Sequence, residues 1–457
     1  TVVAKGKRDG MLLEISSERK DDSEVEGRSV QFMSSKGKVL SNLRIGPDIQ
    51  SSKKLQSNSQ LCFMGVIPHG KGMVVSQATA KKLSEGRKLP SGILRPYSNG
   101  KNLTSGKMDR LVIDAFPLSE GDLRDIAPSV YQWLNDAVKP LRETNRDKDL
   151  REKWWLHRRN NQVMRNALRN LKRYIATVET SKHRFFVFVD GAVLPDQKLR
   201  VVALMDGWQI SVLSSKYHTL FADAAGGRLG VGNDPVYNGT LCFDPFPFPD
   251  LTEDQKTLLR VLGEQLDAHR KRQQAAHAKL TLTQMYNVLE KLRAGEVIEG
   301  KDREIYDQGL ISILRDLHDQ VDTVVAEAYG WPVDISDEEI LCRLVTLNKE
   351  RAREESQGHI RWLRPDYQNP TGQQATKGKQ TELDVGSATK IEKAPWPKTL
   401  PGQIAAVRAT LQELGEATPD QIARRFIRAR TTSVQPLLES LAALGQATPV
   451  ENGKYIP

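Results

Sequence analysis

A segment with a proline at every second position divides this chain into two parts of different character. Residues 243–249, with the sequence FDPFPFP, carry prolines at 245, 247 and 249. A helix cannot continue through this spacing, because proline has no backbone N–H to donate and its ring clashes with the preceding turn. The segment therefore predicts an extended connection, with separate structures before and after it.

The part before this connection is rich in strand-like patterns. Short apolar runs are separated by turn residues, and Asp190-Gly191 and Asp206-Gly207 are dipeptides that favour hairpin turns. The glycine-rich residues 226–235 lack apolar periodicity and predict an irregular loop. We expect strands at residues 61–67, 93–97, 110–116, 184–189, 199–205 and 209–213, and helices at residues 77–86, 127–138 and 215–224.

The part after the connection is helical. Leucines at helical spacing and an N-cap at Thr252 predict a helical stretch over residues 251–295, and further helices are expected over 302–328 and 335–356. A polar segment rich in Gly, Gln, Thr and Lys follows and is typical of a linker. The tail combines three helical patterns with a final hairpin, which predicts a winged helix. Domains of this kind bind DNA or contact proteins, and both alternatives stay open for this one.

The sequence therefore predicts an α+β fold with several domains. Its length of 457 residues is sufficient for two to four of them. We expect a mixed α+β domain, a helical module and a winged-helix-like C-terminal domain. The boundaries are residues 1–58 for a leading segment, 59–249 for the mixed domain, 250–368 for the helical module, 369–396 for the linker and 397–457 for the winged-helix-like domain.

Positive charge is concentrated in one window of the mixed domain. The formal net charge of the chain is +10, and residues 141–173 alone hold 11 Lys or Arg against four Asp or Glu. No acidic residue occurs from 156 to 178. Such a concentration suits nucleic acid or an anionic membrane surface, whereas the alternative is a solvated basic helix. The side chains that we expect to contact DNA phosphates are Arg158, Arg159, Arg165, Arg169 and Arg173.

The sequence contains no recognisable catalytic, cofactor-binding or metal-binding motif. It has no phosphate-binding loop, no His-Glu-x-x-His, and no Pro-Pro dipeptide. The tetrapeptide (Asp/Asn/Ser)-Pro-Pro-(Tyr/Phe), which holds the target amine in amino-methyltransferases, is therefore absent. Cys62, Cys242 and Cys342 are far apart in sequence, which predicts no zinc site, no disulfide framework and a reducing cytoplasm. No apolar run approaches the roughly 20 residues of a membrane span, so we expect no membrane partner.

Four separated motifs resemble those of one protein family. They are REKWWLH at 151–157, RYIATVETSKHRFFVFVDGAVLPD at 173–196, GVGNDP at 230–235 and FPFP at 246–249. Their order is similar to that in the C-terminal half of the MmeI-like DNA methyltransferases, a class I family that uses S-adenosyl-L-methionine to methylate adenine at N6. Some members carry a nuclease and act in restriction–modification, and others serve in phage defence. The resemblance implies that residues 59–249 are a target recognition domain and residues 250–368 its helical C-terminal module.

The resemblance also implies what the chain lacks. Residues 1–58 would be a remnant of the methyltransferase core with a linker, while the cofactor-binding and catalytic motifs of that core are missing. We therefore expect no cofactor in this chain, and S-adenosyl-L-methionine in a complete enzyme whose core acts in cis or in trans. The chain itself would supply sequence-specific recognition of double-stranded DNA in the cytoplasm.

Base recognition requires side chains that match the edges of the bases. Arg and Lys pair with guanine, and carboxylates accept from cytosine. From their neighbourhood to the family motifs, the base-reading candidates are Glu179, Lys182, Arg184, Ser214, Lys216, His218 and Arg228. Two other functions remain open. One is a stand-alone DNA-binding regulator that acts through the winged helix, and the other is a complete enzyme whose catalytic residues the sequence does not reveal.

Overall fold

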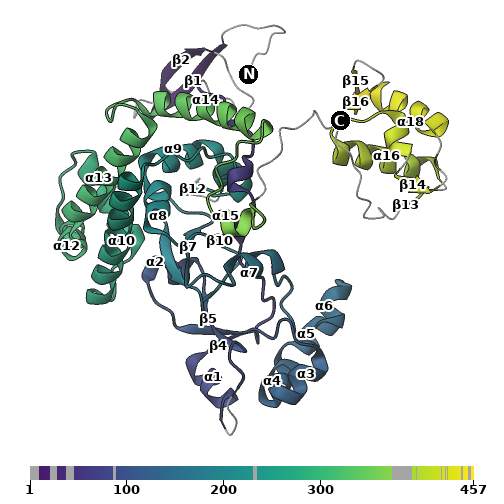
Figure 1. Ribbon diagram of the computed structural model, residues 1–457, viewed down its shortest axis with the longest axis horizontal. Helices are drawn as coiled ribbons and strands as arrows, with labels where there is room; N and C mark the ends of the chain where they lie inside the picture. The colour runs from purple at the N-terminus through teal and green to yellow at the C-terminus, as the bar shows by residue number, and fades with distance from the viewer. Residues whose placement is uncertain are drawn as a thin grey trace. The chain divides into compact units, whose positions relative to one another are not determined.

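The structure is a computed structural model, and it describes most of the chain. The described residues are 10–20, 28–37, 46–85, 89–229, 234–372, 394–397, 399–423, 425–427, 429, 431–443, 446–450 and 454–456. They fall into two compact units, residues 1–378 and residues 379–457, each of which is described by itself (Figure 1). Most of the linker predicted at residues 369–396 lies outside the described residues.

A four-stranded antiparallel sheet lies at the centre of the first unit. Its strand order is β3 (Cys62–Met64), β10 (Leu199–Val202), β7 (Arg173–Val178) and β8 (Val187–Asp190). Tyr174, Ile175 and Ala176 of β7 are fully buried, because helices and connecting segments cover both faces of this strand. The sheet therefore belongs to the main hydrophobic core of the unit.

A second sheet is joined to the first through a short strand. Its order is β4 (Val74–Ser76), β6 (Arg110–Ile113), β5 (Leu94–Ser98) and β9 (Leu194–Pro195). Strand β9 follows β8 in the chain and pairs in parallel with β5, so it ties the two sheets together. A separate apolar core lies between this sheet and its helices. The helices of this region are α1 (Gln77–Leu83), α2 (Gly100–Ser105), α3 (Glu120–Ile126), α4 (Pro128–Ala137), α5 (Lys139–Glu143), α6 (Lys148–Glu152) and α7 (Gln162–Leu168).

Helices gather beside the central sheet and form the helical module (Figure 1). The long helix α10 packs against α8, and the two backbones touch where glycines meet. A Cβ atom on Gly263 would overlap the carbonyl oxygen of Gly207, and a Cβ atom on Gly207 would overlap that of Arg260. Helices α8 (Gly207–Ser214) and α9 (Lys216–Ala225) belong to the mixed domain, and the helices of the helical module are α10 (Glu253–Ala276), α11 (Leu282–Arg293), α12 (Gly300–Gly309), α13 (Ile311–Tyr329) and α14 (Asp337–Ser356).

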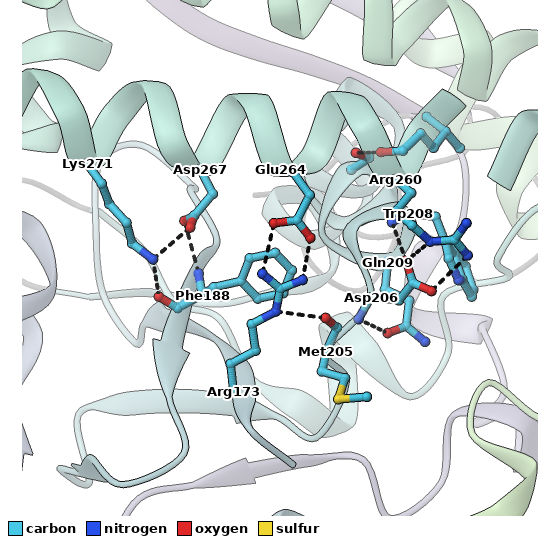
Figure 2. A network of polar contacts seen from close by, with 12 residues as sticks. Arg173, Phe188, Met205, Asp206, Trp208, Gln209, Arg260, Glu264, Asp267 and Lys271 are labelled. Atoms are coloured by element: carbon cyan, nitrogen blue, oxygen red, sulfur yellow. Dashed lines mark hydrogen bonds and ion pairs between the residues drawn. The ribbon is translucent and has the colours of Figure 1, made fainter. Parts of the chain in front are cut away.

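One face of α10 carries charged side chains that hold the ends of sheet strands (Figure 2). Glu264 receives two N–H donors from Arg173 of β7. One turn further on, Asp267 accepts the backbone N–H of Phe188 at 3.1 Å. At the other end of the row, Arg260 donates to both carboxylate oxygens of Asp206, at 2.8 and 2.9 Å. The module is thus attached to α8 by buried glycine contacts, and to the loop before α8 and the sheet strands by a row of polar links.

A short strap after the module returns to the sheet. Arg364, at the start of α15 (Pro365–Gln368), donates to the carbonyls of Ala167 and Ala203. Gln368 donates to the carbonyls of Ser57 and Ser59, each at 2.9 Å. The strap therefore joins segments separated by more than 150 residues in sequence, at the C-terminal ends of α7 and β10.

Two strand pairs lie outside these sheets in the first unit. β1 (Gly10–Lys20) and β2 (Arg28–Gly37) form an antiparallel hairpin. β11 (Arg228–Leu229) and β12 (Asp234–Pro235) form a second, very short pair within the glycine-rich segment predicted as a loop, of which residues 230–233 lie outside the described part.

The C-terminal unit has the topology of a winged helix. Three helices enclose an apolar core that includes Val407, Ile422 and Leu438. Tyr455 of the last strand bridges Ala417, which lies between the first two helices, as the strand order of a winged helix requires. The elements are β13 (Ala394–Pro395), α16 (Leu400–Leu414), α17 (Pro419–Ala423), β14 (Phe426–Ile427), α18 (Thr431–Ala443), β15 (Thr448–Val450) and β16 (Lys454–Ile456).

The predicted α+β class is confirmed, and so are most of the predicted strands and helices. The strand predicted at residues 209–213 is wrong, because these residues belong to helix α8. Asp206 caps that helix, with its own N–H donating to the Gln209 side chain at 3.0 Å. Nearly every side of α8 is buried, so its sequence lacks the polar face that would reveal a helical period.

Two other sequence interpretations also change. The single helix predicted over 302–328 is two helices, α12 and α13, separated by Leu310 in the left-handed region at φ 44°. The acid-free run 156–178 is not one solvated helix, because only the seven residues of α7 are helical and the run ends in the buried strand β7. No helix among the described residues is long and apolar enough to cross a membrane.

The glycine contact between α8 and α10 leads to a stability prediction. Gly263→Ala places a methyl group against a backbone carbonyl that cannot move aside, so we expect the free energy of unfolding to fall by about 2–3 kcal/mol. Gly121→Ala is the control, because Gly121 lies in the exposed helix α3 with space around it, and there we expect a gain of about 0.5–1 kcal/mol. Chemical denaturation of the two variants measures both values. Equal effects would contradict the close contact.

A buried arginine near the second sheet leads to another stability prediction. Arg142 is 1% exposed and donates to the carbonyls of Pro68, His69, Trp154 and Leu156, with no carboxylate among these partners. Burial lowers the pKa of this guanidinium to about 10. Lysine cannot reach four acceptors from one fork, so we expect Arg142→Lys to lower the free energy of unfolding by about 3 kcal/mol. A denaturation midpoint like that of the wild type would refute this role.

Candidate nucleic-acid interface

The connection between α6 and α7 lies along the edge strand of the central sheet. The backbone of Arg159 exchanges hydrogen bonds with Ile67, just beyond β3, at 3.1 and 3.3 Å. Asn161 then donates to the Met64 carbonyl at 2.6 Å, and its own left-handed backbone at φ 51° starts helix α7. These contacts fix the arginines of residues 158–159 at the edge of the sheet.

These arginines line an open cleft of about 570 Å³. Lys153, Arg158, Arg159 and Asn160 contribute polar groups to it, and Asp147 and Asp149 of the α6 region face the same space. Arg158 is half exposed, and its Nε lies 3.7 Å from the Asp147 carboxylate. An exposed ion pair of this kind contributes little to stability, so the guanidinium can exchange its partner for a phosphate.

Two side chains that line the cleft, His157 and Asn160, carry no charge near pH 7. His157 is buried, and its Nε2 lies 2.7 Å from the Ile113 carbonyl. Burial lowers the pKa of this imidazole to about 4, so the ring is neutral near pH 7. Among the described residues, the Asn160 side-chain oxygen has no hydrogen-bond partner.

The positive surface continues across the sheet from the cleft. Arg159 Nη1 lies 3.1 Å from the Met64 sulfur, and Met64 is paired with Arg200 in the β3–β10 ladder. Directly paired residues point to the same face of a sheet. Arg200 in turn forms an ion pair with Glu179, just beyond the end of β7. The surface thus runs over three neighbouring strands.

Glu179 lies between two cations on this surface. Its carboxylate binds the guanidinium of Arg200 and, at 3.0 Å, the ammonium of Lys198. Its backbone is fixed by hydrogen bonds to Lys198 at 2.8 Å and Tyr237 at 2.7 Å. We call the continuous surface the edge strip and define it by seven residues, which are Met64, Lys153, Arg158, Arg159, Glu179, Lys198 and Arg200.

Two of the arginines predicted to contact phosphates form ion pairs with carboxylates of other elements. Arg165 donates to both oxygens of Asp114, at 2.8 and 2.9 Å, and its side chain is 14% exposed. Arg173 is bound to Glu264 and lies 3.7 Å above the Phe188 ring (Figure 2). In this structure the donors of both arginines already have carboxylate partners, and contact of Arg165 or Arg173 with a phosphate stays a prediction.

Three of the predicted base-reading residues are buried. Arg184 is 8% exposed and donates to Thr177, Val178 and Pro235. His218 is fully buried, with Nε2 at 2.9 Å from the Tyr237 hydroxyl, and burial lowers its pKa to about 3. Ser214 is buried in α8. None of the three can touch a base edge in this conformation, so these assignments are corrected.

The remaining predicted residues are accessible to different degrees. Lys216 is half-buried and donates to the Val333 carbonyl at 2.7 Å. Lys182 is exposed and pairs with Glu290 of α11 at 2.7 Å. Arg169 and Arg228 are exposed. For these residues, and for Arg158, Arg159 and Glu179, contact with DNA stays a prediction.

Lys198 and Arg200 were missed by the sequence reasoning. One signal was present, because Arg200 interrupts the apolar run that forms β10 and so marks the side of that strand that leaves the core. Asn160 gave no such signal, since an asparagine in a basic connection has no distinctive spacing. In the part of the chain that the structure describes, no group of three or more His, Cys, Asp or Glu could hold a metal ion.

Comparison with known proteins gives a family match, similar solved structures and one negative result. The family model described as MmeI, target recognition domain, matches residues 48–250. Among solved structures, the chain is similar to the Type IIL restriction-modification enzyme MmeI in complex with DNA, with 14% identity and a TM-score of 0.57. That match covers 76% of this chain and 42% of the enzyme, so this chain spans less than half of the enzyme's length. No curated protein matches the chain.

The matched segment is continuous and contains both sheets, the cleft and all seven residues of the edge strip. The similar solved structure extends the likeness of fold to three quarters of the chain. This protein therefore contains a target recognition domain of the MmeI type, formed by residues 48–250.

Proposed function

We propose that this chain binds duplex DNA and recognises a specific sequence, as the recognition part of a restriction–modification protein. The observation that carries the proposal is the edge strip. Its cleft holds the cations of Lys153, Arg158 and Arg159, and the Glu179 carboxylate nearby lies between the cations of Lys198 and Arg200. Cations bind phosphates and fix the register of a protein on DNA. A carboxylate and an arginine side by side can distinguish bases, because one accepts from cytosine and the other donates to guanine.

The complete system, in this proposal, methylates adenine at N6 and acts in the cytoplasm in restriction–modification or phage defence. S-adenosyl-L-methionine would bind to a methyltransferase core that acts in cis or in trans. In the glycine-rich loop, a Cβ atom on Gly226 would overlap the Val236 carbonyl oxygen, so this glycine serves close packing of the backbone.

Removal of the cleft arginines tests the phosphate contacts. We expect Arg158→Ala/Arg159→Ala to weaken duplex binding for all sequences and to lower the slope of log K against log salt by about 0.9 for each lost contact, or about two in total. The measurement is a titration of duplex DNA at about 50 and 200 mM salt, which spans the range where this slope is steep.

The matched control is Arg303→Ala/Arg315→Ala, which removes the same charge from the helical module. Arg303 is exposed and Arg315 is half-buried, and each pairs with a nearby carboxylate of its own helix. We expect this variant to bind DNA almost as well as the wild type. If the two double variants lose affinity equally, net charge explains the binding and the cleft has no special role.

Replacement of Glu179 tests base discrimination. Glu179→Gln removes the charge that Arg200 and Lys198 share, so we expect tighter non-specific binding together with weaker preference for the target sequence. The loss of preference at one base pair should be about 5- to 150-fold, the range of about 1–3 kcal/mol for one well-placed pair. Selection from a randomised duplex library, repeated with Glu253→Gln as control, measures it. An unchanged consensus would mean that Glu179 only stabilises the fold.

Cofactor binding separates this proposal from its alternative as a complete enzyme. In the same preparations we expect no binding of S-adenosyl-L-methionine by the chain alone. Tight binding would support a complete enzyme instead. Retention of all sequence preference by the Arg158→Ala/Arg159→Ala and Glu179→Gln variants would support the other alternative, a regulator that binds through the winged helix.

A further inference from the structure

Helix α10 leaves one face uncovered along most of its length. Its buried side chains lie on the other sides, which pack against α8, α13 and the central sheet. The uncovered positions follow a spacing of three and four residues, which places them in one stripe along the helix. The stripe consists of Leu258, Val261, Gln265, Ala268, Arg272 and Ala275. Leu258 and Val261 are 48% and 47% exposed, so two large apolar side chains face solvent one turn apart.

The stripe is self-complementary in size. Its first half carries the large side chains of Leu258 and Val261, and its second half carries Ala268 and Ala275. In an antiparallel pair of such helices, with a two-fold axis between positions 265 and 268, Leu258 of one copy lies opposite Ala275 of the other. Val261 then lies along the aliphatic stem of Arg272, whose charged end stays in water. A large apolar group thus meets a small group or a flexible stem.

A cleft beside Ala275 fits the side chain that this packing brings to it. The cleft has a volume of about 330 Å³ and lies between α2, β8 and the C-terminal end of α10. Its walls are mainly apolar and include Leu103, Val187 and Met108, of which Met108 is 42% exposed. Leu258 of a second copy would leave water on entering this space, which is favourable for an apolar side chain.

Charge at the two ends of the stripe favours the antiparallel arrangement. Asp254, in the first turn of α10, is exposed. Arg272 and Lys279 are exposed near the other end, and Lys107 lines the cleft. The two-fold packing brings Asp254 of each copy towards Lys279 of the other, whereas parallel packing would bring like charges together. Opposite charges across an interface fix the orientation and register of the partner.

We infer that the stripe of α10 is a self-association surface, on which two copies of this chain pack antiparallel and each inserts Leu258 into the cleft of the other. A small apolar ligand in the cleft would leave Leu258 and Val261 exposed, so it explains less of the surface. One helix pair makes a small interface, and we expect a reversible dimer with a Kd on the order of 10 μM. No residue of the stripe belongs to the edge strip, so the inference does not rest on the proposed function.

Sedimentation velocity of the full chain from about 1 to 100 μM tests this inference in the range of weak interfaces. We expect the wild type to pass from monomer to dimer, and Leu258→Glu/Val261→Glu to raise the Kd at least about tenfold, because two carboxylates would be buried without partners. Val297→Glu/Val333→Glu is the matched control, since these valines are exposed in the same module outside the stripe. The control should change the Kd by less than about twofold. Thermal melting verifies that all variants remain folded.

An exchange of charge gives a second readout. Asp254→Lys brings a lysine towards Lys279 of the second copy, so we expect the Kd to rise about threefold. Asp254→Lys/Lys279→Glu should restore the wild-type Kd, because the pair is formed again with its signs reversed. A substitution that only weakened the start of α10 would not be rescued in this way, and absence of rescue would refute the antiparallel register.

Duplex binding distinguishes failure of this inference from failure of the proposed function. We expect Leu258→Glu/Val261→Glu to bind DNA like the wild-type monomer, and Arg158→Ala/Arg159→Ala to dimerise like the wild type. A wild type that stays monomeric up to about 100 μM, a stripe variant that still dimerises, or a control that dissociates equally overturns the inference, whatever the result for DNA. Dimerisation as expected without duplex binding by any variant would support the inference and refute the proposed function.

Discussion

The direct backbone contact between α8 and α10 is the constraint on which the rest of the first unit depends. Because Gly207 and Gly263 carry no side chains, the two helices approach until one backbone touches the other. Helix α8 directly follows the loop after β10, so this contact fixes α10 at a set distance from the central sheet. At that distance the charged face of α10 reaches β7 and β8, and the polar links of Figure 2 become possible.

This arrangement decides which basic residues remain available at the surface. Arg173 is bound by a carboxylate on α10, and Arg165 by Asp114 beside the second sheet. The donors of both arginines are used by these carboxylates. Arg158 and Arg159 lie on the connection between α6 and α7, where Arg158 has only a partly exposed ion pair with Asp147 at 3.7 Å among the ion pairs described. The same run of sequence thus contributes both structural arginines and arginines that face the cleft.

The sequence could not separate these two groups of arginines. Arg165 and its partner Asp114 are 51 residues apart, and Arg173 and Glu264 are 91 apart. Ion pairs of such separation leave no periodic signal in one sequence. Strands and helices with one apolar face were predictable, because their period reflects burial on one side. Helix α8 was not predictable, because it is buried on almost every side and so shows no helical period. The break between α12 and α13 was not predictable either, because a leucine such as Leu310 rarely adopts a left-handed backbone.

The acidic residues of the recognition domain fit the same physical argument. Asp147 and Asp149 line the cleft with the arginines, and Glu179 lies between Lys198 and Arg200. Carboxylates at such positions repel phosphates and so weaken contact with DNA in general. In the function proposed above, a duplex in the right register would offer phosphates to the cations and base amino groups to the carboxylates, and each internal pair would be replaced by an external one. A duplex in the wrong register breaks the internal pairs without replacing them. Mixed charge on the edge strip therefore favours discrimination between sequences, whereas a purely basic surface would favour affinity for any DNA.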